Sequence, residues 1–543
     1  MFKKELSILK IQYIDYKKYN LILLFLFLLH QIHFIRIGGT VWDDIDLIST
    51  SYVVLEKYKL LFTDPSNPYL SEFAANNEFY GYLVIIPVTK ITEIFFKFSN
   101  INFLDFEYSD LYYQIRYIIF NLYIILLLRV IFLNLSKIIG DKKSFLFVSY
   151  FLMVPSINGH MLFNLKDIPF LLHSLLLVIF LIIIFNRNEG GLNVNEILKI
   201  AILSSILLLI RANGILIFIF SYFFVSIKYI VQKKKFNKIY NLIINFVSIN
   251  LISFLFFILF TPSSWQKPKL YFEKLFEVQF RFSTEVVTLT DGTYISSLNI
   301  PPEYLLKWFY FKLPIIFHFA IIWVLVNLTK IKKFNVLTQF SILFLSTFFI
   351  IFSFLKPAAY DGIRQYLFLV PFFVFLLIEF ITKIENNTLK SLFVIFSFVY
   401  LIFTQSGLGA YKYIYFNEFA SFGLSEDENC DNFKDCKNWF FDYWGYSSKE
   451  TGSKINDQLL PIYVCEPKNV FQPYIKNKII EKNQIIDYKN FLVATLDRGD
   501  KYRVLCSELD DSLLKNCTPN IKTYINLRSR KVLLSSIYKC INN

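Results

Sequence analysis

Long apolar runs alternate with short polar turns from about residue 21 to residue 405 of the chain. Each run is long enough to approach or complete a membrane crossing as a helix, and Lys and Arg gather in alternate turns, as they do in cytoplasmic loops. The pattern predicts eleven spans, at about 21–37, 112–133, 144–161, 168–186, 196–210, 212–229, 239–260, 308–328, 335–355, 365–382 and 388–405. With residues 1–20 inside, eleven crossings place residues 406–543 outside.

One apolar segment does not fit this series. Residues 82–98 contain Pro87, Lys90, Glu93 and Lys97. If they crossed the membrane, every later turn would change sides and the basic turns would lie outside. We therefore expect an amphipathic or re-entrant helix at the outer interface.

The composition also indicates a membrane protein. Of 543 residues, 55% are hydrophobic and 63 are Phe, which is more apolar surface than a soluble domain of this length can bury. The net charge of +14 comes with the basic turns and does not indicate a nucleic-acid partner. We predict an α-helical polytopic membrane protein with about eleven transmembrane helices. Outer loops 38–111 and 261–306 belong to the transmembrane module 21–405, and residues 406–543 form a small extracytoplasmic α+β domain.

All six cysteines lie in this predicted outer domain. An even number confined to one polar domain is typical of disulfides in an oxidising compartment. Cys430 and Cys436 would close a short loop and are the first candidate pair. The alternative is a set of free thiols in a cytoplasmic domain.

An acidic group follows the first predicted span, where Asp43 and Asp44 are adjacent and Asp46 comes two residues later. Carboxylates at a membrane boundary are costly unless they are solvated or paired. The helix dipole favours Asp in a first helical turn, which accounts well for one of the three. The other interpretation is a general base that acts on a hydroxyl group, and the residues alone leave both open.

The stretch GHMLFNLKDIPF, residues 159–170, places His160, Asn164, Lys166 and Asp167 at the head of a predicted span. Asp167 can cap that helix, and Lys166 can extend toward the interface. This structural interpretation does not require His and Asn beside them. The other interpretation is that Lys166 binds an anionic phosphate as a point charge.

Further cations lie at the same predicted face. Arg364 follows Tyr360 and Asp361 in a short outer turn, and Arg116 and Arg211 lie near the outer ends of other spans. Positive charge normally gathers inside, and Arg suits bidentate phosphate recognition, so this outer group indicates an anionic ligand. Trp265, in the second outer loop, is either an interface anchor or a substrate contact.

Several enzyme classes are disfavoured because their motifs are missing. The sequence contains no Walker loop, no GxSxG and no HExxH, and its five His form no metal-spaced set. This argues against an ATPase, a serine hydrolase and a zincin. A divalent cation held by Asp43, Asp44 and Asp167 stays open, since hard cations favour oxygen ligands.

These motifs together resemble those of bacterial GT-C glycosyltransferases, the group related to dolichyl-phosphate-mannose protein mannosyltransferases and lipid A aminoarabinose transferases. The resemblance rests on the acidic pair after the first span and, in order along the chain, on GHMLFNLKDIPF (159–170), RANG (211–214), Pro262 with Trp265, YDGIRQYLFLVP (360–371), YIYFN (413–417) and DYWGYSSKE (442–450). The chain departs from the family in having Asp-Asp where Asp-Glu is common and NLK in place of NPK.

The resemblance implies a GT-C-like fold that transfers a sugar from a polyprenyl-phosphate donor to an unknown glycan, lipid or protein acceptor. The expected location is the bacterial inner membrane, with residues 406–543 in the periplasm. Asp43 or Asp44 would deprotonate the acceptor hydroxyl, with inversion at the sugar. The implied phosphate-binding residues are Lys166, Arg211 and Arg364, and the implied substrate-binding or orienting residues are His160, Asn164, Asp167, Tyr360, Asp361 and Trp265. The alternatives are a transporter or flippase of a lipid-linked saccharide, and a receptor or scaffold built on residues 406–543.

Overall fold

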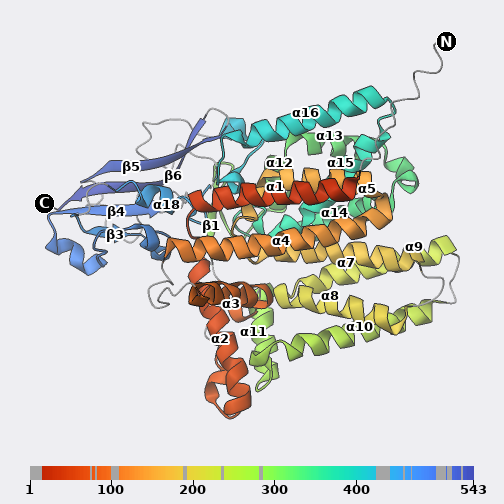
Figure 1. The fold of residues 1–543 in the computed structure, drawn as a ribbon, viewed down its shortest axis with the longest axis horizontal. Helices are drawn as coiled ribbons and strands as arrows, with labels where there is room; N and C mark the ends of the chain where they lie inside the picture. Colours follow the sequence, from red (N-terminus) through yellow and green to blue (C-terminus); the bar gives the residue numbers. More distant parts are fainter. Residues whose placement is uncertain are drawn as a thin grey trace.

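Most of the long helices run side by side along the long axis of the molecule, and a β-sheet region lies at one end of them (Figure 1). This computed structural model describes residues 15–73, 76–79, 82–98, 109–187, 192–233, 238–280, 285–423, 439, 441–455, 459–465, 467–496, 509, 516–527 and 530–542. Within those ranges, eight helical segments are long and apolar enough to span a membrane: α1 (Tyr16–Ile37), α4 (Asp110–Ile139), α7 (Asp167–Arg187), α9 (Gly214–Lys233), α10 (Ile239–Leu259), α14 (Val336–Leu355), η7 (Arg364–Leu369) with α15 (Val370–Lys383), and α16 (Asn387–Ser406).

Proline interrupts two other predicted spans. The segment predicted at 144–161 consists of α5 (Asp141–Met153) and α6 (Pro155–His160), which meet at Pro155. Proline lacks the N–H that would continue the first helix, so the second one starts there.

The segment predicted at 308–328 is also divided. Helices α12 (Tyr304–Lys312) and α13 (Ile315–Val326) meet at an angle of 120° across a break that contains Pro314. If this bent pair is one span, the described residues contain up to nine. The predicted α-helical polytopic membrane fold is therefore confirmed.

Helix α7 lies at the centre of the bundle. Its most apolar window is 94% buried, whereas that of the peripheral helix α16 is 17% buried. The 17-residue helix α8 (Val194–Ile210), at the position of the remaining predicted span, packs against α7 and α10. A helix that is apolar all round belongs inside a bundle. Since Asp167 opens α7, the charged turn before it lies at the end of the most buried candidate span.

Three helices of the outer loops are not among the candidate spans: α2 (Asp44–Thr63), α3 (Tyr82–Phe98) and α11 (Pro268–Phe280). Figure 1 shows α2 and α11 running across the direction of α1 and α4. On α3, large apolar side chains at Ile91, Ile94, Phe95 and Phe98 are exposed along one helical face. This is the kind of face that an interfacial helix presents to lipid.

The C-terminal region is small and mixes helices with strands. Its elements after α16 include η8 (Lys412–Ile414), η9 (Glu418–Gly423), α18 (Ser448–Gly452), β3 (Ile462–Val464), β4 (Asn490–Leu496), β5 (Cys517–Leu527) and β6 (Arg530–Ile541). The strand order is β3-β4-β6-β5, with β3 parallel to β4 and the other pairs antiparallel. The predicted β-containing C-terminal region is confirmed. The second outer loop adds a hairpin of β1 (Val287–Thr290) and β2 (Thr293–Ser296).

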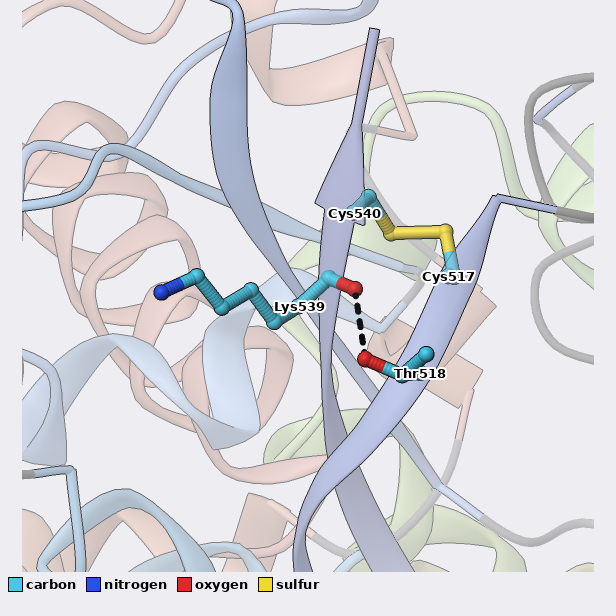
Figure 2. The surroundings of a disulfide bond; sticks show 4 residues. All are labelled: Cys517, Thr518, Lys539 and Cys540. Carbon is cyan, nitrogen blue, oxygen red and sulfur yellow. Dashed lines mark hydrogen bonds between the residues drawn. A yellow bond between two sulfur atoms is a disulfide. The ribbon is translucent and has the colours of Figure 1, made fainter.

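A disulfide joins the two longest strands of the sheet. Cys517 on β5 and Cys540 on β6 are directly paired, and the Thr518 hydroxyl beside them donates to the Lys539 carbonyl at 3.5 Å (Figure 2). Cys465 is also disulfide-bonded. The predicted Cys430–Cys436 pair lies outside the described residues.

Candidate active site

The two carboxylates at the start of α2 have different surroundings. Asp44 accepts hydrogen bonds from the Val41 backbone N–H at 3.0 Å and from Arg116 at 2.5 Å. The Tyr117 hydroxyl donates to the same carboxylate. The Asp44 side chain is 1% exposed, against 22% for Asp43. The hydrogen bonds of Asp44 therefore fix the turn at the start of α2 to Arg116 and Tyr117. Asp43 is the more accessible carboxylate.

Each predicted phosphate-binding cation forms an ion pair with a carboxylate. The pairs are Lys166 with Asp43 at 2.6 Å, Arg211 with Asp167, and Arg364 with Asp361 at 3.3 Å. The first two pairs join the start of α2 and the end of α8 to the turn before α7, and the third lies within the turn before η7. The charge of Arg364 also acts on Asp43 and Asp167. The six groups carry no net charge when all are ionised, so an anionic ligand must compete with carboxylates for the cations.

Asn164 fixes the turn that carries Lys166 and Asp167. Its Oδ1 accepts the backbone N–H of Lys166 at 3.2 Å and that of Asp167 at 2.9 Å. Its Nδ2 donates to the Asp167 carboxylate at 2.9 Å and lies 3.3 Å from Nδ1 of His160. An amide side chain supplies both an acceptor and a donor, which a carboxylate or an amine does not. Asn164 therefore orients Lys166 and Asp167, and it contacts His160 as well.

Arg364 lies among three aromatic rings. Its guanidinium carbon is 4.8 Å from the ring centre of Tyr360, 5.0 Å from that of Tyr443 and 4.8 Å from that of Trp444. A planar guanidinium stacks on aromatic faces and keeps its N–H groups at its edge. These rings fix the plane in which Arg364 can donate hydrogen bonds.

The turn before Arg364 has an unusual backbone. Asp361 and Gly362 both have positive φ, at 57° and 64°. Glycine adopts this region freely, and a Cβ at position 362 would also lie 2.9 Å from the Trp308 ring. Asp tolerates the region better than most residues, at some cost in energy. The turn places the Asp361 carboxylate beside Arg364.

The C-terminal region supplies one wall of the site. The backbone N–H of Gly39 donates to the Tyr446 carbonyl at 2.9 Å, and that of Trp42 donates to the Trp444 carbonyl at 3.1 Å. The Tyr446 ring lies against Gly38, where an added Cβ would come within 2.0 Å of it. The segment leading to the acidic turn is therefore held by a loop from the other end of the chain.

Burial and charge act in opposite directions on Asp43. Burial alone would raise the pKa of this carboxyl, but Lys166 and Arg364 outweigh it and hold the pKa below the ordinary value of 3.8. Asp43 is therefore ionised near neutral pH and available to accept a proton.

The carboxylates do not form a metal-ligand set. In the part of the chain that the structure describes, no group of three His, Cys, Asp or Glu side chains is arranged to hold a metal ion. Asp43, Asp44 and Asp167 each have a different cationic partner. Their geometry therefore does not fit the divalent cation that the sequence left open.

Trp265 lies with a different group of residues. Its indole N–H donates to the Ile258 carbonyl at the end of α10, and the residue is 40% exposed. Nearby, Ser263 donates to Glu78 at 2.8 Å, and Glu78 pairs with Lys57 at 2.6 Å, with both charged side chains fully buried. This arrangement ties the two outer loops together. A substrate contact for Trp265 stays a prediction.

Three residues near the ion pairs were not predicted from the sequence as site residues. Tyr117 binds Asp44, and Tyr443 stacks on Arg364. Lys312 is buried at the end of α12, where its Nζ lies 3.3 Å from the Tyr413 carbonyl. A lysine inside an apolar run is a signal of function or pairing that could have pointed to Lys312.

Comparisons with known proteins give similarities to solved structures but none in sequence. No protein-family model and no curated protein sequence matches the chain. The chain is similar to the crystal structure of ArnT from Cupriavidus metallidurans bound to undecaprenyl phosphate, with 9% identity and a TM-score of 0.44 over 95% of this chain and 97% of that one.

Proposed function

We propose that the protein is a membrane glycosyltransferase that moves a sugar from a polyprenyl-phosphate donor to an acceptor hydroxyl at the outer face of the membrane. The observation that carries this proposal is the convergence of an accessible carboxylate, Asp43, with a set of cations. Displacement of a phosphate from a sugar needs a base for the incoming hydroxyl and fixed positive charge for the outgoing phosphate. The cations are Lys166, Arg211 and Arg364.

Asp43 is the general base in this proposal, because Asp44 already accepts three hydrogen bonds. The acceptor oxygen forms a bond to the anomeric carbon while its proton passes to Asp43. The bond between that carbon and the phosphate oxygen breaks, and its electron pair stays on the phosphate. Attack from the opposite side inverts the anomeric carbon.

The leaving phosphate gains one negative charge as this bond breaks. The side chain of Arg211 is 16% exposed and that of Lys166 is 8% exposed, so Arg211 is the more accessible of the two cations. Arg364 lies over the rings of Tyr360, Tyr443 and Trp444, which hold its guanidinium in place. Donors that are fixed before the reaction stabilise developing charge without reorganisation.

An apolar groove supports a lipid-linked donor. The groove has a volume of about 750 Å³ and is lined from α3, α4, α7, α8 and α10 by residues that include Leu83, Leu126 and Leu209. Leu209 is two residues before Arg211, so the groove and a site cation share the end of α8. A polyprenyl chain in the groove would have its phosphate near the cations.

The disulfides support the proposed location of the C-terminal region. Disulfides persist in oxidising compartments such as the periplasm. We place the site and residues 406–543 on the outer side of a bacterial inner membrane.

The proposal is tested by mass spectrometry of cell-surface glycans from cells that lack the gene, compared with deleted cells that express the wild type, Asp43→Asn or Lys356→Gln. Lys356 is exposed at the end of α14 and serves as the control. We expect one sugar to disappear on deletion and to return with the wild type and with Lys356→Gln, but not with Asp43→Asn. If Asp43→Asn restores the sugar fully at equal expression, Asp43 is not the base and the transporter interpretation is favoured.

A further inference from the structure

Lys166 differs from the other two site cations in its partner. Arg211 and Arg364 pair with Asp167 and Asp361, which keep their charge throughout the proposed reaction. Lys166 pairs at 2.6 Å with Asp43, the one carboxylate that takes up a proton. What this pair does during the reaction rests on the proposed function.

The charges around Lys166 change in opposite directions during the reaction. Asp43 goes from an anion to a neutral acid as it accepts the hydroxyl proton. The donor phosphate, a diester with one negative charge, becomes a monoester with two as the sugar leaves. The total charge is conserved, and the negative charge moves from the base to the phosphate.

We propose that Lys166 passes from Asp43 to the lipid phosphate, so that Asp43 becomes a stronger base only when the phosphate is present. A lysine paired to a carboxylate at 2.6 Å stabilises its ionised form and weakens it as a base. Drawing that lysine away removes the stabilisation. The phosphate thereby activates the base for its own displacement, and an enzyme without donor does not deprotonate other hydroxyls.

The local structure permits this movement. The backbone N–H of Lys166 is held by Asn164 at 3.2 Å, so the start of the side chain is fixed. The four-carbon stem beyond it is flexible, and the ammonium group binds anions as a point charge without a required plane. Arg364, by contrast, is confined by three rings.

The other charged groups that bear on Asp43 do not replace Lys166. Arg364 contributes an attractive charge, whereas Asp167 contributes a repulsive one. Asp46, one turn further along α2, interacts with both Asp43 and Lys166. Asp44 on the same turn is compensated by Arg116. After Lys166 leaves, the groups nearest Asp43 contribute charges of both signs, and burial favours its neutral form.

The test measures the protons taken up when a short-chain polyprenyl phosphate binds to the purified full-length protein near pH 5. Isothermal titration calorimetry in two buffers with different ionisation enthalpies gives this number, and the neutral polyprenol serves as the lipid control. The phosphate itself titrates, with a second pKa of about 6, and can release protons on binding. The difference between the wild type and Asp43→Asn therefore isolates the protons that bind to Asp43.

We expect this difference to be on the order of half a proton per bound lipid in the wild type and in a Lys356→Gln background. In a Lys166→Gln background it should be much smaller, because Asp43 is already a stronger base before the lipid binds. An equal difference with and without Lys166 would overturn the inference, since the phosphate charge alone would then act on Asp43. Polyprenyl phosphate that binds no better than polyprenol would overturn the proposed function as well.

Discussion

The carboxylate of Asp44 lies 2.5 Å from the guanidinium of Arg116, a residue 72 positions further along the chain. Both side chains are almost completely buried, at 1% and 0% exposure. The pair fixes the start of α2 to α4, and its neighbour Asp43 is left partly exposed. Two adjacent and chemically identical residues therefore have different roles.

We expect the two acidic residues to give opposite phenotypes when each is changed to Asn. Asp43→Asn should lower the transfer rate by on the order of 10²–10⁴-fold, the usual contribution of a general base, with a smaller loss of stability than Asp44→Asn because the Asp43–Lys166 pair is more exposed. Asp44→Asn leaves the Arg116 charge buried without a counter-charge and should lower the free energy of unfolding by about 3–5 kcal/mol. Thermal unfolding in detergent and transfer assays on both variants measure the two effects. Equal melting temperatures would contradict this division of roles.

Replacements of Arg364 should separate its charge from its shape. Arg364→Met should lower kcat by on the order of 10²–10³-fold, the usual loss when a group that stabilises transition-state charge is removed. Arg364→Lys should lie between this variant and the wild type, because it keeps the charge but loses the planar group that stacks on the rings. Steady-state kinetics with the Lys356→Gln control measure this order. A rise in KM with unchanged kcat would instead assign Arg364 to ground-state binding.

Gly159 and Gly140 offer a comparison between steric exclusion and backbone strain. A Cβ at Gly159 would lie 2.1 Å from the backbone nitrogen of Tyr413, whereas one at Gly140 meets nothing within 4 Å. Gly140 has a φ of 82° and a ψ of 159°, a backbone region almost confined to glycine, so Gly140→Ala should cost about 1–3 kcal/mol. Gly159→Ala forces η8 away from α6 and should cost about 2–3 kcal/mol or more. Thermal unfolding of both variants tests this, and a more stable Gly159→Ala would contradict the close contact.

The pH dependence of the reaction should report on the Asp43–Lys166 pair. Burial alone would raise the pKa of Asp43, but Lys166 and Arg364 outweigh it and hold the pKa below 3.8. A carboxyl whose pKa is lower in the folded protein contributes to folding stability above its pKa in the unfolded chain. That contribution is lost as the pH falls through its pKa in the folded protein. We therefore expect the acid limb of kcat/KM to lie below about pH 4 in the wild type and to move to higher pH in Lys166→Gln. Profiles of kcat/KM for the acceptor at low donor concentration measure the shift, and identical limbs in both proteins would contradict it.

The helices were predictable from the sequence because the membrane imposes length and hydropathy on each span. The interruptions at Pro155 and Pro314 were missed, since hydropathy averages over a proline while the backbone stops there. The hairpin from Val287 to Ser296 was also missed. It is short, and its Thr290 backbone bridges to Trp439, a contact that no local pattern encodes.

The charged residues of the site were predictable as a group because each stands out against apolar neighbours. Their pairing was not predictable, since the Asp43–Lys166 pair crosses more than a hundred residues of chain. The sequence likewise could not show that Asp44 is enclosed while Asp43 is accessible. Trp444 is buried and also stacks on Arg364, a contact that the motif DYWGYSSKE did not reveal.

The hold of the C-terminal region on the acidic turn has a consequence for biosynthesis. The Asn469 amide that binds the Trp42 carbonyl is made 427 residues after it, and the loop at Trp444 is made almost as late. All the predicted spans are therefore synthesised before the turn that carries Asp43 receives these backbone partners. Under the proposed function, a nascent chain that lacks these C-terminal residues should not yet transfer a sugar, because its acidic turn is without these backbone partners.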